Sequence, residues 1–301
     1  NSFQVSSTMS NVNGDTWEQY MGANASLVSK DNVYGIAVYQ SYRNRNPYDV
    51  DGDSFSEIGK LNMNTFGLRA YYRPTQFSRL NIEYHTTNEF RRGGNKFDLE
   101  PFETDITEQT KHVINSGGLT YDLFWKEYKH KVSVYTSAQH VDRNSYYGAQ
   151  QDPNAYGKTK DLTFVGGGMY VGNFEKVLFS PATFTAGLEY QHNNMHDIMA
   201  GYNRDLEQKV RIASAFFQNE WKMNDFTLLA GFRLDDHNLI DNLIFSPRVN
   251  MLYKPSDAFQ GRLTWSTGFR APQSYDEDLH ITAVGGEGVL IHLADGLKPE
   301  K

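Results

Sequence analysis

The connections between predicted strands alternate in length along this chain, and this alternation constrains the fold more than any other feature. Apolar and polar residues alternate with period two through most of the sequence, which predicts β-strands. We predict tight turns at 29–32, 74–76, 126–128, 177–182, 224–225 and 255–258, and longer polar connections at 43–61, 90–111, 145–160, 197–209, 236–242 and 272–301. In an antiparallel meander every second connection lies on the same rim, so tight turns should occupy one rim and longer loops the other.

The predicted strands are long. Thirteen can be drawn, at 2–10, 16–28, 33–43, 62–73, 77–90, 111–125, 129–145, 161–174, 183–196, 210–223, 226–237, 243–254 and 258–271. Most exceed the 5–6 residues that are usual in soluble proteins and suit a tilted membrane crossing of about 9–11 residues. Short turns on one rim and long loops on the other are typical of outer-membrane β-barrels.

The alternation within each strand separates an apolar from a polar face. In the strand at 258–271, Phe259, Leu263, Trp265 and Phe269 share one face, and Arg262 lies on the other. A soluble sandwich would show the same alternation with the apolar face inward. Aromatic residues make up 14% of the chain, and many flank the tight turns, as in the interfacial girdles of membrane barrels. We therefore expect the apolar face to point outward.

Composition excludes several classes of protein. The chain has no cysteine, so it can form neither a disulfide nor a thiolate metal site, and its net charge of −7 includes no basic run suited to nucleic acid. Its mean hydropathy is −0.61, and no run of about 18 apolar residues predicts a transmembrane helix. No linker divides residues 1–301, which we treat as one domain. Because both ends look cut and single-chain barrels have even strand numbers, we expect part of a larger barrel.

Sequence segments near the C-terminus carry a family resemblance. They are FSPRVNMLYKP at 245–255, RLTWSTGFRAPQ at 262–273, the acidic run at 276–280 and LKPEK at 297–301. Upstream, GLEY at 187–190, QNEW at 218–221 and GFRLD at 231–235 resemble strands of the same barrels. In this order and spacing, the chain resembles the barrel of TonB-dependent outer-membrane receptors.

The resemblance implies a fold and a function. The fold is all-β, an up-and-down meander forming part of a barrel of about 22 strands that encloses a plug domain. The function is uptake of a scarce nutrient, such as a ferric siderophore, haem or cobalamin, across the outer membrane of a Gram-negative bacterium. The expected partners are the receptor's own plug domain, the TonB complex, outer-membrane lipid and the nutrient, with no nucleic acid. Two alternatives remain: an outer-membrane enzyme barrel such as a protease or lipase, and a soluble all-β binding protein.

An acidic loop is a candidate calcium site. Asp49, Asp51, Asp53 and Glu57 offer hard oxygen ligands at close spacing. The spacing departs from that of an EF-hand loop, which needs glycine at its sixth position and glutamate at its twelfth. A solvent-exposed acidic loop without metal explains the same residues.

A second acidic cluster follows the last predicted strand. Its members are Asp276, Glu277, Asp278 and His280. They are candidates for ligand binding or for ion pairs that lock neighbouring loops together. This cluster is also the only one that could serve the enzyme alternative, because the sequence contains no nucleophile-elbow, metalloprotease or phosphate-loop motif.

Two further groups of residues are candidate sites. His192 and His196 resemble a soft-metal pair, but on one strand they lie about 13 Å apart and cannot share an ion unless the segment bends. Charged residues on the polar faces should form a lattice inside the barrel that holds the plug. The basic members are Arg69, Arg79, Arg233, Arg262 and Arg270, and the acidic members are Glu83, Glu189 and Asp235.

Overall fold

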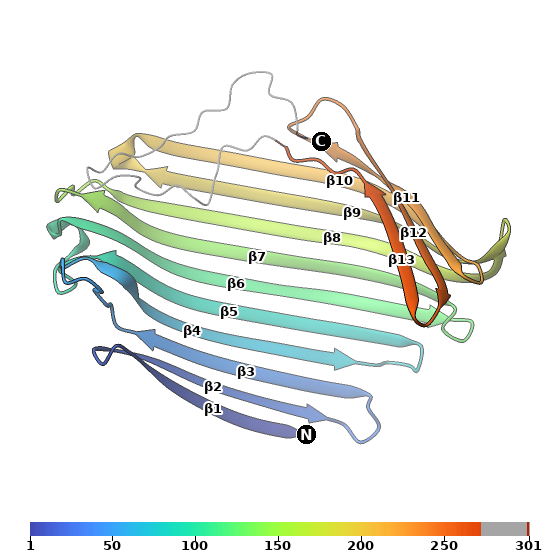
Figure 1. Cartoon of the computed structure of the whole chain (residues 1–301), viewed down its shortest axis with the longest axis horizontal. Helices are drawn as coiled ribbons and strands as arrows, with labels where there is room; N and C mark the ends of the chain where they lie inside the picture. Colours follow the sequence, from blue (N-terminus) through green and yellow to red (C-terminus); the bar gives the residue numbers. More distant parts are fainter. Residues whose placement is uncertain (272–299, 301) are drawn as a thin grey trace.

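The computed structural model describes residues 1–271 and residue 300, and these residues form one sheet of thirteen antiparallel strands in sequence order (Figure 1). The strands are β1 (Ser2–Val12), β2 (Thr16–Val28), β3 (Tyr34–Arg45), β4 (Ser56–Tyr72), β5 (Ser78–Gly94), β6 (Ile106–Trp125), β7 (His130–Ala149), β8 (Tyr156–Val177), β9 (Ser180–Met199), β10 (Arg204–Lys222), β11 (Phe226–His237), β12 (Ile244–Ser256) and β13 (Phe259–Ser266). Two short 3₁₀ turns, η1 (Pro101–Glu103) and η2 (Ala200–Tyr202), lie in connections. None of the helices in the described part is long and apolar enough to cross a membrane.

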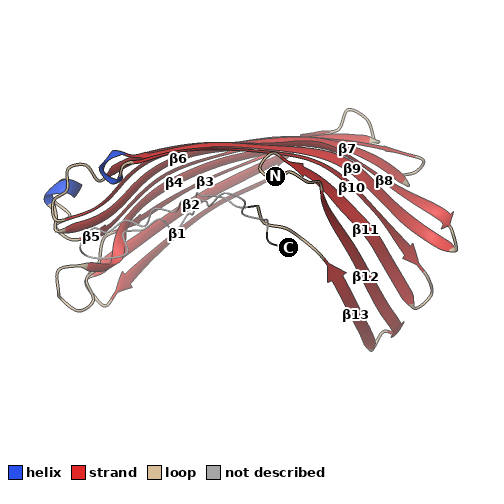
Figure 2. Cartoon of the chain, turned by 90° about the horizontal axis from the view of Figure 1, so that it is seen from above, coloured by secondary structure: helices blue, strands red, loops and turns tan. Residues whose placement is uncertain are grey.

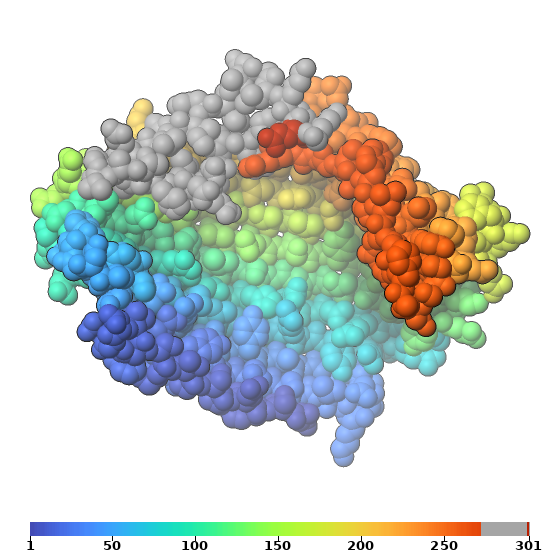
Figure 3. Space-filling view, viewed as in Figure 1, coloured from blue at the N-terminus to red at the C-terminus, as the bar shows by residue number. Residues whose placement is uncertain are grey.

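The sheet is strongly curved and open. Seen from above, it forms an arc with β1 and β13 at its two edges (Figure 2). The space-filling view shows the hollow of the concave side (Figure 3). The predicted meander and the predicted order of all thirteen strands are confirmed.

The connections separate to two rims as expected. Those that follow β2, β4, β6, β8, β10 and β12 lie at the right-hand ends of the strands in Figure 1. Those that follow β1, β3, β5, β7 and β9 lie at the left, and the connection after β11 lies at the upper end of that strand, opposite its turn. We call these the turn rim and the loop rim. The loops are shorter than the sequence predicted: the connection expected at 145–160 spans only residues 150–155, and β1 joins β2 through 13–15 alone. Polar residues at the loop rim continue the backbone ladder, which satisfies their N–H and C=O groups.

The end of β13 corrects one prediction. The strand stops at Ser266 rather than at residue 271, because its partner Pro247 has no N–H to continue the ladder. Phe269 therefore does not join the outward apolar face. Its ring lies 6.2 Å from the ring of His237 in an edge-on contact. His237 belongs to the concave-facing set of β11, so Phe269 turns inward.

The convex face carries an uncharged band. On β8, every second residue from Leu162 to Phe174 points outward, and none of these outward residues carries a charge. Thirteen residues rise about 40 Å along a strand, which corresponds to about 28 Å of height at a 45° tilt. Large apolar side chains in this band are well exposed, including Leu188 (67%) and Leu263 (67%). The band matches the apolar height of about 25 Å in outer-membrane barrels.

The loop-side boundary of this band crosses the strands obliquely. The first charged outward residue is Lys111 on β6 and Arg211 on β10. Through the ladder, Lys111 aligns with Asp205 on β10, so the boundary moves six residues toward the turn rim across four strands. The boundary thus moves about 20 Å along the strands over about 19 Å across them, so it is inclined at about 45° to the strand direction. Strands tilted by about 45° in a flat slab produce this boundary.

Aromatic rings gather near the turn rim, where the sequence predicts an interfacial girdle. One group lies on the concave side and so is not part of that girdle: Tyr128 in the turn after β6 lies 5.6 Å from Phe77 and 5.4 Å from Phe124, measured between ring centroids, and Phe124 shares the concave face of β6 with Asp122. The Tyr128 hydroxyl donates a hydrogen bond to the Gln76 carbonyl, which joins two neighbouring turns. Phe226 and Tyr253 stack at 4.5 Å across β11 and β12.

Candidate functional site: the charged concave face

The concave face carries a connected charged network over β7–β11. Arg233 on β11 lies 2.9 Å from Glu189 on β9, and its Nε lies 2.7 Å from Asp235. Ser214 on β10 donates a hydrogen bond to Asp235, and the Tyr135 hydroxyl on β7 donates one to Glu189. Asp235 is only 2% exposed, so the guanidinium of Arg233 compensates a carboxylate that water scarcely reaches. The network joins the charged side chains of β9 and β11 to hydroxyl groups of β7 and β10.

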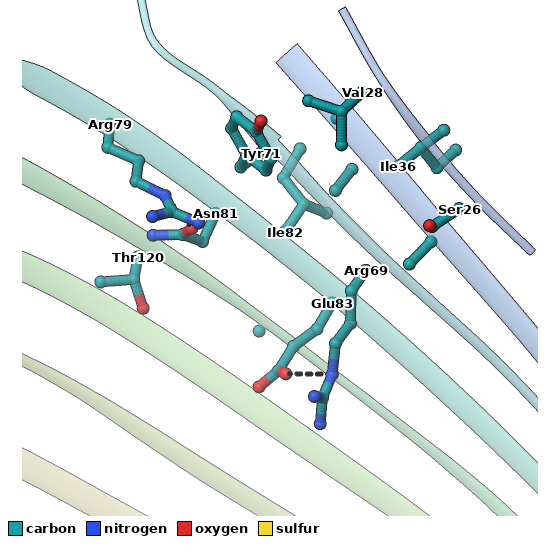
Figure 4. Close-up of a pocket in the computed structure, with 14 residues that line it drawn as sticks. Ser26, Val28, Ile36, Arg69, Tyr71, Arg79, Asn81, Ile82, Glu83 and Thr120 are labelled. Carbon is teal, nitrogen blue, oxygen red and sulfur yellow. Dashed lines mark hydrogen bonds and ion pairs between the residues drawn. The ribbon is translucent and has the colours of Figure 1, made fainter. Parts of the chain in front are cut away.

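A second charged group lies on β4 and β5 and is drawn in Figure 4. Arg69 lies 3.7 Å from Glu83, although both side chains are more than half exposed, which makes the pair weak. Arg79 donates a hydrogen bond to Asn81 and stacks over the Tyr71 ring at 4.7 Å from its centroid. These side chains line an open cavity of about 510 Å³ on the concave face.

A third network lies closer to the loop rim. Asp197, which is 2% exposed, forms ion pairs with Arg204 at 2.7 Å and with Arg143 at 3.5 Å. Thr159 donates a hydrogen bond to the same carboxylate. Sequence pattern alone does not identify these residues, because 145–160 and 197–209 have the polar composition of loops, and a buried polar position there does not interrupt any apolar–polar alternation.

Tyrosine rings bridge the concave face across glycines. Tyr135 lies over Gly167 of β8, where a Cβ would come within 2.6 Å of the Tyr135 hydroxyl oxygen, and reaches Glu189 on β9. In the same way Tyr39 lies over Gly67 of β4 and reaches His85 on β5 at 2.7 Å. Glycine is needed at these positions because a side chain would displace the ring. Glycine within a strand at such a position marks the close approach of another part of the molecule, here the Tyr135 ring.

The remaining predicted concave-face residues differ in their surroundings. Arg262 lies on β13 and is exposed, and none of the ion pairs of the described residues includes it. Arg270 lies beyond β13 and forms a backbone bridge with Glu300. The structure therefore joins Arg69 to Glu83 and Arg233 to Glu189 and Asp235, but leaves Arg262 and Arg270 outside these networks. Contact with a plug domain remains a prediction for all of them.

The acidic loop brings its four carboxylates together. Ligand atoms of Asp49, Asp51, Asp53 and Glu57 all lie within 4.8 Å of one another. The backbone already satisfies several of these oxygens: Asp49 accepts hydrogen bonds from the N–H groups of Gly52 and Ser54, both at 2.7 Å. The residues suit calcium by donor type, but the same geometry is also that of a turn held by its own carboxylates. Calcium binding stays a prediction.

The two histidines of β9 lie on one face of a regular strand. His192 and His196 share the convex face of β9, as expected, and lie opposite Arg211 and Glu207 on β10. The strand does not bend them toward each other, and His196 instead lies 2.7 Å from Asp205. The separation of the two histidines agrees with their spacing on one strand, and a shared metal site, which would need a bend, stays a hypothesis. Asp276, Glu277, Asp278 and His280 lie outside the described residues.

Two residues in connections at the loop rim have pKa values shifted by their immediate surroundings. A hydrogen bond from Lys96, together with one from Asn95, lowers the pKa of Asp105 below its ordinary value. Burial raises the pKa of Tyr202 in η2, whose hydroxyl donates a hydrogen bond to the Tyr147 carbonyl at 2.5 Å. These contacts tie the connections at 95–105 and 200–203 to the strand ends beneath them.

Comparisons with known proteins agree with this architecture. The profile of the family described as TonB dependent receptor-like, beta-barrel, matches residues 13–301. Among solved structures, the siderophore receptor PirA from Pseudomonas aeruginosa superposes with a TM-score of 0.73 at 14% identity and covers 99% of this chain. PirA from Acinetobacter baumannii gives 0.71 at 17% identity over 90% of this chain. The ferric enterobactin receptor of Pseudomonas aeruginosa, solved with enterobactin, gives 0.70 at 14% identity, also over 90% of this chain.

These similarities concern the fold. The chain spans 49%, 43% and 44% of the three solved chains, so it corresponds to less than half of each. No match was found among curated proteins.

Proposed function

The chain belongs to the TonB-dependent receptor β-barrel family, and on that premise we propose that it forms part of an outer-membrane receptor that takes up a ferric siderophore. The observation that carries the proposal is the opposition of the two faces of the sheet. The convex face presents an uncharged band of membrane height, and the concave face presents the ion-pair networks of Arg233 and Asp197.

The two faces support a membrane receptor over the soluble alternative. A soluble sandwich would cover its apolar face, whereas Leu188, Leu263 and Trp265 here project outward with more than half of their surface exposed. Exposed apolar area of this extent is stable only against lipid or another apolar surface. The localisation that follows is the outer membrane of a Gram-negative bacterium.

The substrate class is proposed from the solved relatives. PirA and the ferric enterobactin receptor are siderophore receptors by their descriptions, and they share this fold. Haem and cobalamin remain competitors from the sequence analysis. Uptake would be driven through TonB, and the plug domain would contact the concave face at Arg69, Arg79, Glu83, Arg233, Arg262 and Arg270.

Uptake by the complete receptor tests this function. The complete gene is expressed in a Gram-negative strain that lacks its own siderophore receptors, in the presence and absence of TonB. We expect accumulation of radiolabelled iron from a ferric siderophore only when TonB is present. A panel of ferric catecholate, ferric hydroxamate, haem and cobalamin separates the ligands. Accumulation of haem or cobalamin alone would overturn the siderophore assignment, and TonB-independent accumulation would overturn the energy coupling.

A further inference from the structure

Basic residues mark the loop-side boundary of the uncharged band. The first charged outward residue is basic on five of the strands from β4 to β11, namely Lys60 on β4, Arg92 on β5, Lys111 on β6, Lys160 on β8 and Arg211 on β10. It is acidic on β7 (Asp142) and β11 (Asp236), and β9 presents only histidines there. This bias opposes the net charge of the whole chain, which is −7.

Three of these cations form an exposed cluster on the convex face, which we call the basic cluster: Lys111, Lys158 and Lys160. Lys111 lies opposite Asn144, and Asn144 lies opposite Lys158, so all three share a small area over β6–β8. Each residue is exposed. None of the three takes part in an ion pair or side-chain hydrogen bond with the described residues, and Lys111 only approaches the Phe90 ring at 5.7 Å.

The spacing of the basic cluster suits one phosphate group. Two strand spacings separate Lys111 from Lys158, about 10 Å between Cα atoms, and Lys158 and Lys160 are about 7 Å apart along β8. A lysine side chain extends about 6 Å, so the three ammonium groups can converge. Arg211 lies two strands away from Lys160 and four residues further toward the turn rim, about 16 Å distant, and can reach only a neighbouring group.

We infer that the basic cluster of Lys111, Lys158 and Lys160 binds the phosphate group of a lipid headgroup in the leaflet on the loop-rim side, and that Arg211 takes the adjacent headgroup. The inference rests on the proposed membrane location. The cluster lies directly at the edge of the uncharged band, where headgroup phosphates lie, and lysines at that level place their alkyl chains against lipid and their charge in the headgroup layer.

Nearby acids define the site further. Asp142 lies opposite Lys160, but no ion pair joins them. On β10, Glu207 forms an ion pair with Lys209 at 2.6 Å, and Asp205 makes a hydrogen-bond contact with His196 at 2.7 Å. The acids on β10 are therefore already paired, and the three lysines outnumber the one unpaired carboxylate beside them. An anionic phosphate group fits this excess of positive charge better than an uncharged headgroup does.

Native mass spectrometry of the complete receptor with phosphatidic acid tests the inference. The receptor is purified in detergent, freed of lipid and titrated with phosphatidic acid, and the apparent dissociation constant is read from the bound fractions. We expect the K111Q/K158Q/K160Q variant to bind roughly 100-fold more weakly, because each surface cation contributes about a fivefold factor to binding of anionic lipid. The charge-conserving K111R/K158R/K160R variant should keep the affinity.

A matched control removes the same charge at the opposite rim. The K30Q/K126Q/K176Q variant changes three exposed lysines near the turn rim and should bind phosphatidic acid as the wild type does. The inference would be overturned if K111Q/K158Q/K160Q bound phosphatidic acid as tightly as the wild type, or if K111R/K158R/K160R lost binding. If inorganic phosphate at equal concentration displaced phosphatidic acid, the basic cluster would be a site for free phosphate and not for a lipid headgroup. Each variant is also inserted into vesicles: failure of the wild type to insert refutes the membrane proposal, whereas normal insertion without phosphatidic acid binding refutes only this inference.

Discussion

Replacement of Arg233 by methionine should destabilise the complete receptor by about 2–3 kcal/mol. The substitution keeps an unbranched side chain up to the position of Nε and removes three polar contacts, to Glu189 at 2.9 Å, to Asp235 at 2.7 Å and to the Ser214 hydroxyl at 2.7 Å. Asp235 is 2% exposed, and its Oδ2 has no hydrogen-bond partner among the described residues, so the buried carboxylate would retain only Ser214. Breaking a buried pair costs about 3–5 kcal/mol, and we reduce this figure because the Arg233 side chain is 37% exposed and water screens it.

Urea unfolding of the complete receptor in lipid vesicles, followed by tryptophan fluorescence, measures the change. The R262M variant is the control, because Arg262 lies on the same face without an ion pair in the described structure and should change stability by less than about 0.5 kcal/mol. The double variant R233M/D235N should recover part of the loss, since a neutral amide needs no cation. A stability of R233M equal to wild type, or strict additivity in the double variant, would refute the reasoning.

Three further predictions concern the band, the rim and the acidic loop. Leu263→Arg should destabilise the complete barrel by about 2–4 kcal/mol in the same unfolding assay, and Arg262→Leu should cost less; the reverse order would mean that the faces are inverted. The Tyr202 contact should be present below the pKa of an unfolded tyrosine, near 10, and should be lost as pH rises through the higher folded pKa. The protection factors of the amides at 200–203, which correct for the base catalysis of exchange, should therefore fall at alkaline pH in the wild type and stay constant in Y202F. Calorimetric titration with calcium should give heat at millimolar calcium or below that the D49N/D53N variant lacks, and the absence of heat would end the calcium hypothesis.

The strands and rims were predictable because their signals are local. Period-two alternation identifies a strand from its own residues, and tight turns separate neighbouring strands. The strand ends near the loop rim were not predictable by the same rule. Thr107 is fully buried and Thr159 is 3% exposed, yet both lie in segments whose polar composition is typical of loops. Their burial results from pairing with neighbouring strands, which composition does not encode.

The charged site shows the same division between local and non-local information. Period two predicts that Arg233 and Asp235 share a face, because they are two residues apart on one strand. The contact of Arg233 with Glu189 also requires the register across β9, β10 and β11, which depends on turn lengths that the sequence predicted only approximately. The network of Asp197, Arg143 and Arg204 was missed altogether, since each member fell in or beside a predicted loop.

The tilt of the sheet emerges only when face and register are combined. The sequence shows which residues are charged, and the alternation shows which of them point outward, but neither places Lys111 and Arg211 at one height. Through the backbone pairing, the two residues are offset by six residues over four strands. Both can lie at the same boundary of a flat layer only if the strands are inclined by about 45° to that layer. Asp236 on β11, one further pair of residues toward the turn rim, continues the same line. In the proposed membrane location, the charged boundary would therefore give the inclination of the strands, and cations that are distant in the ladder would lie at one level.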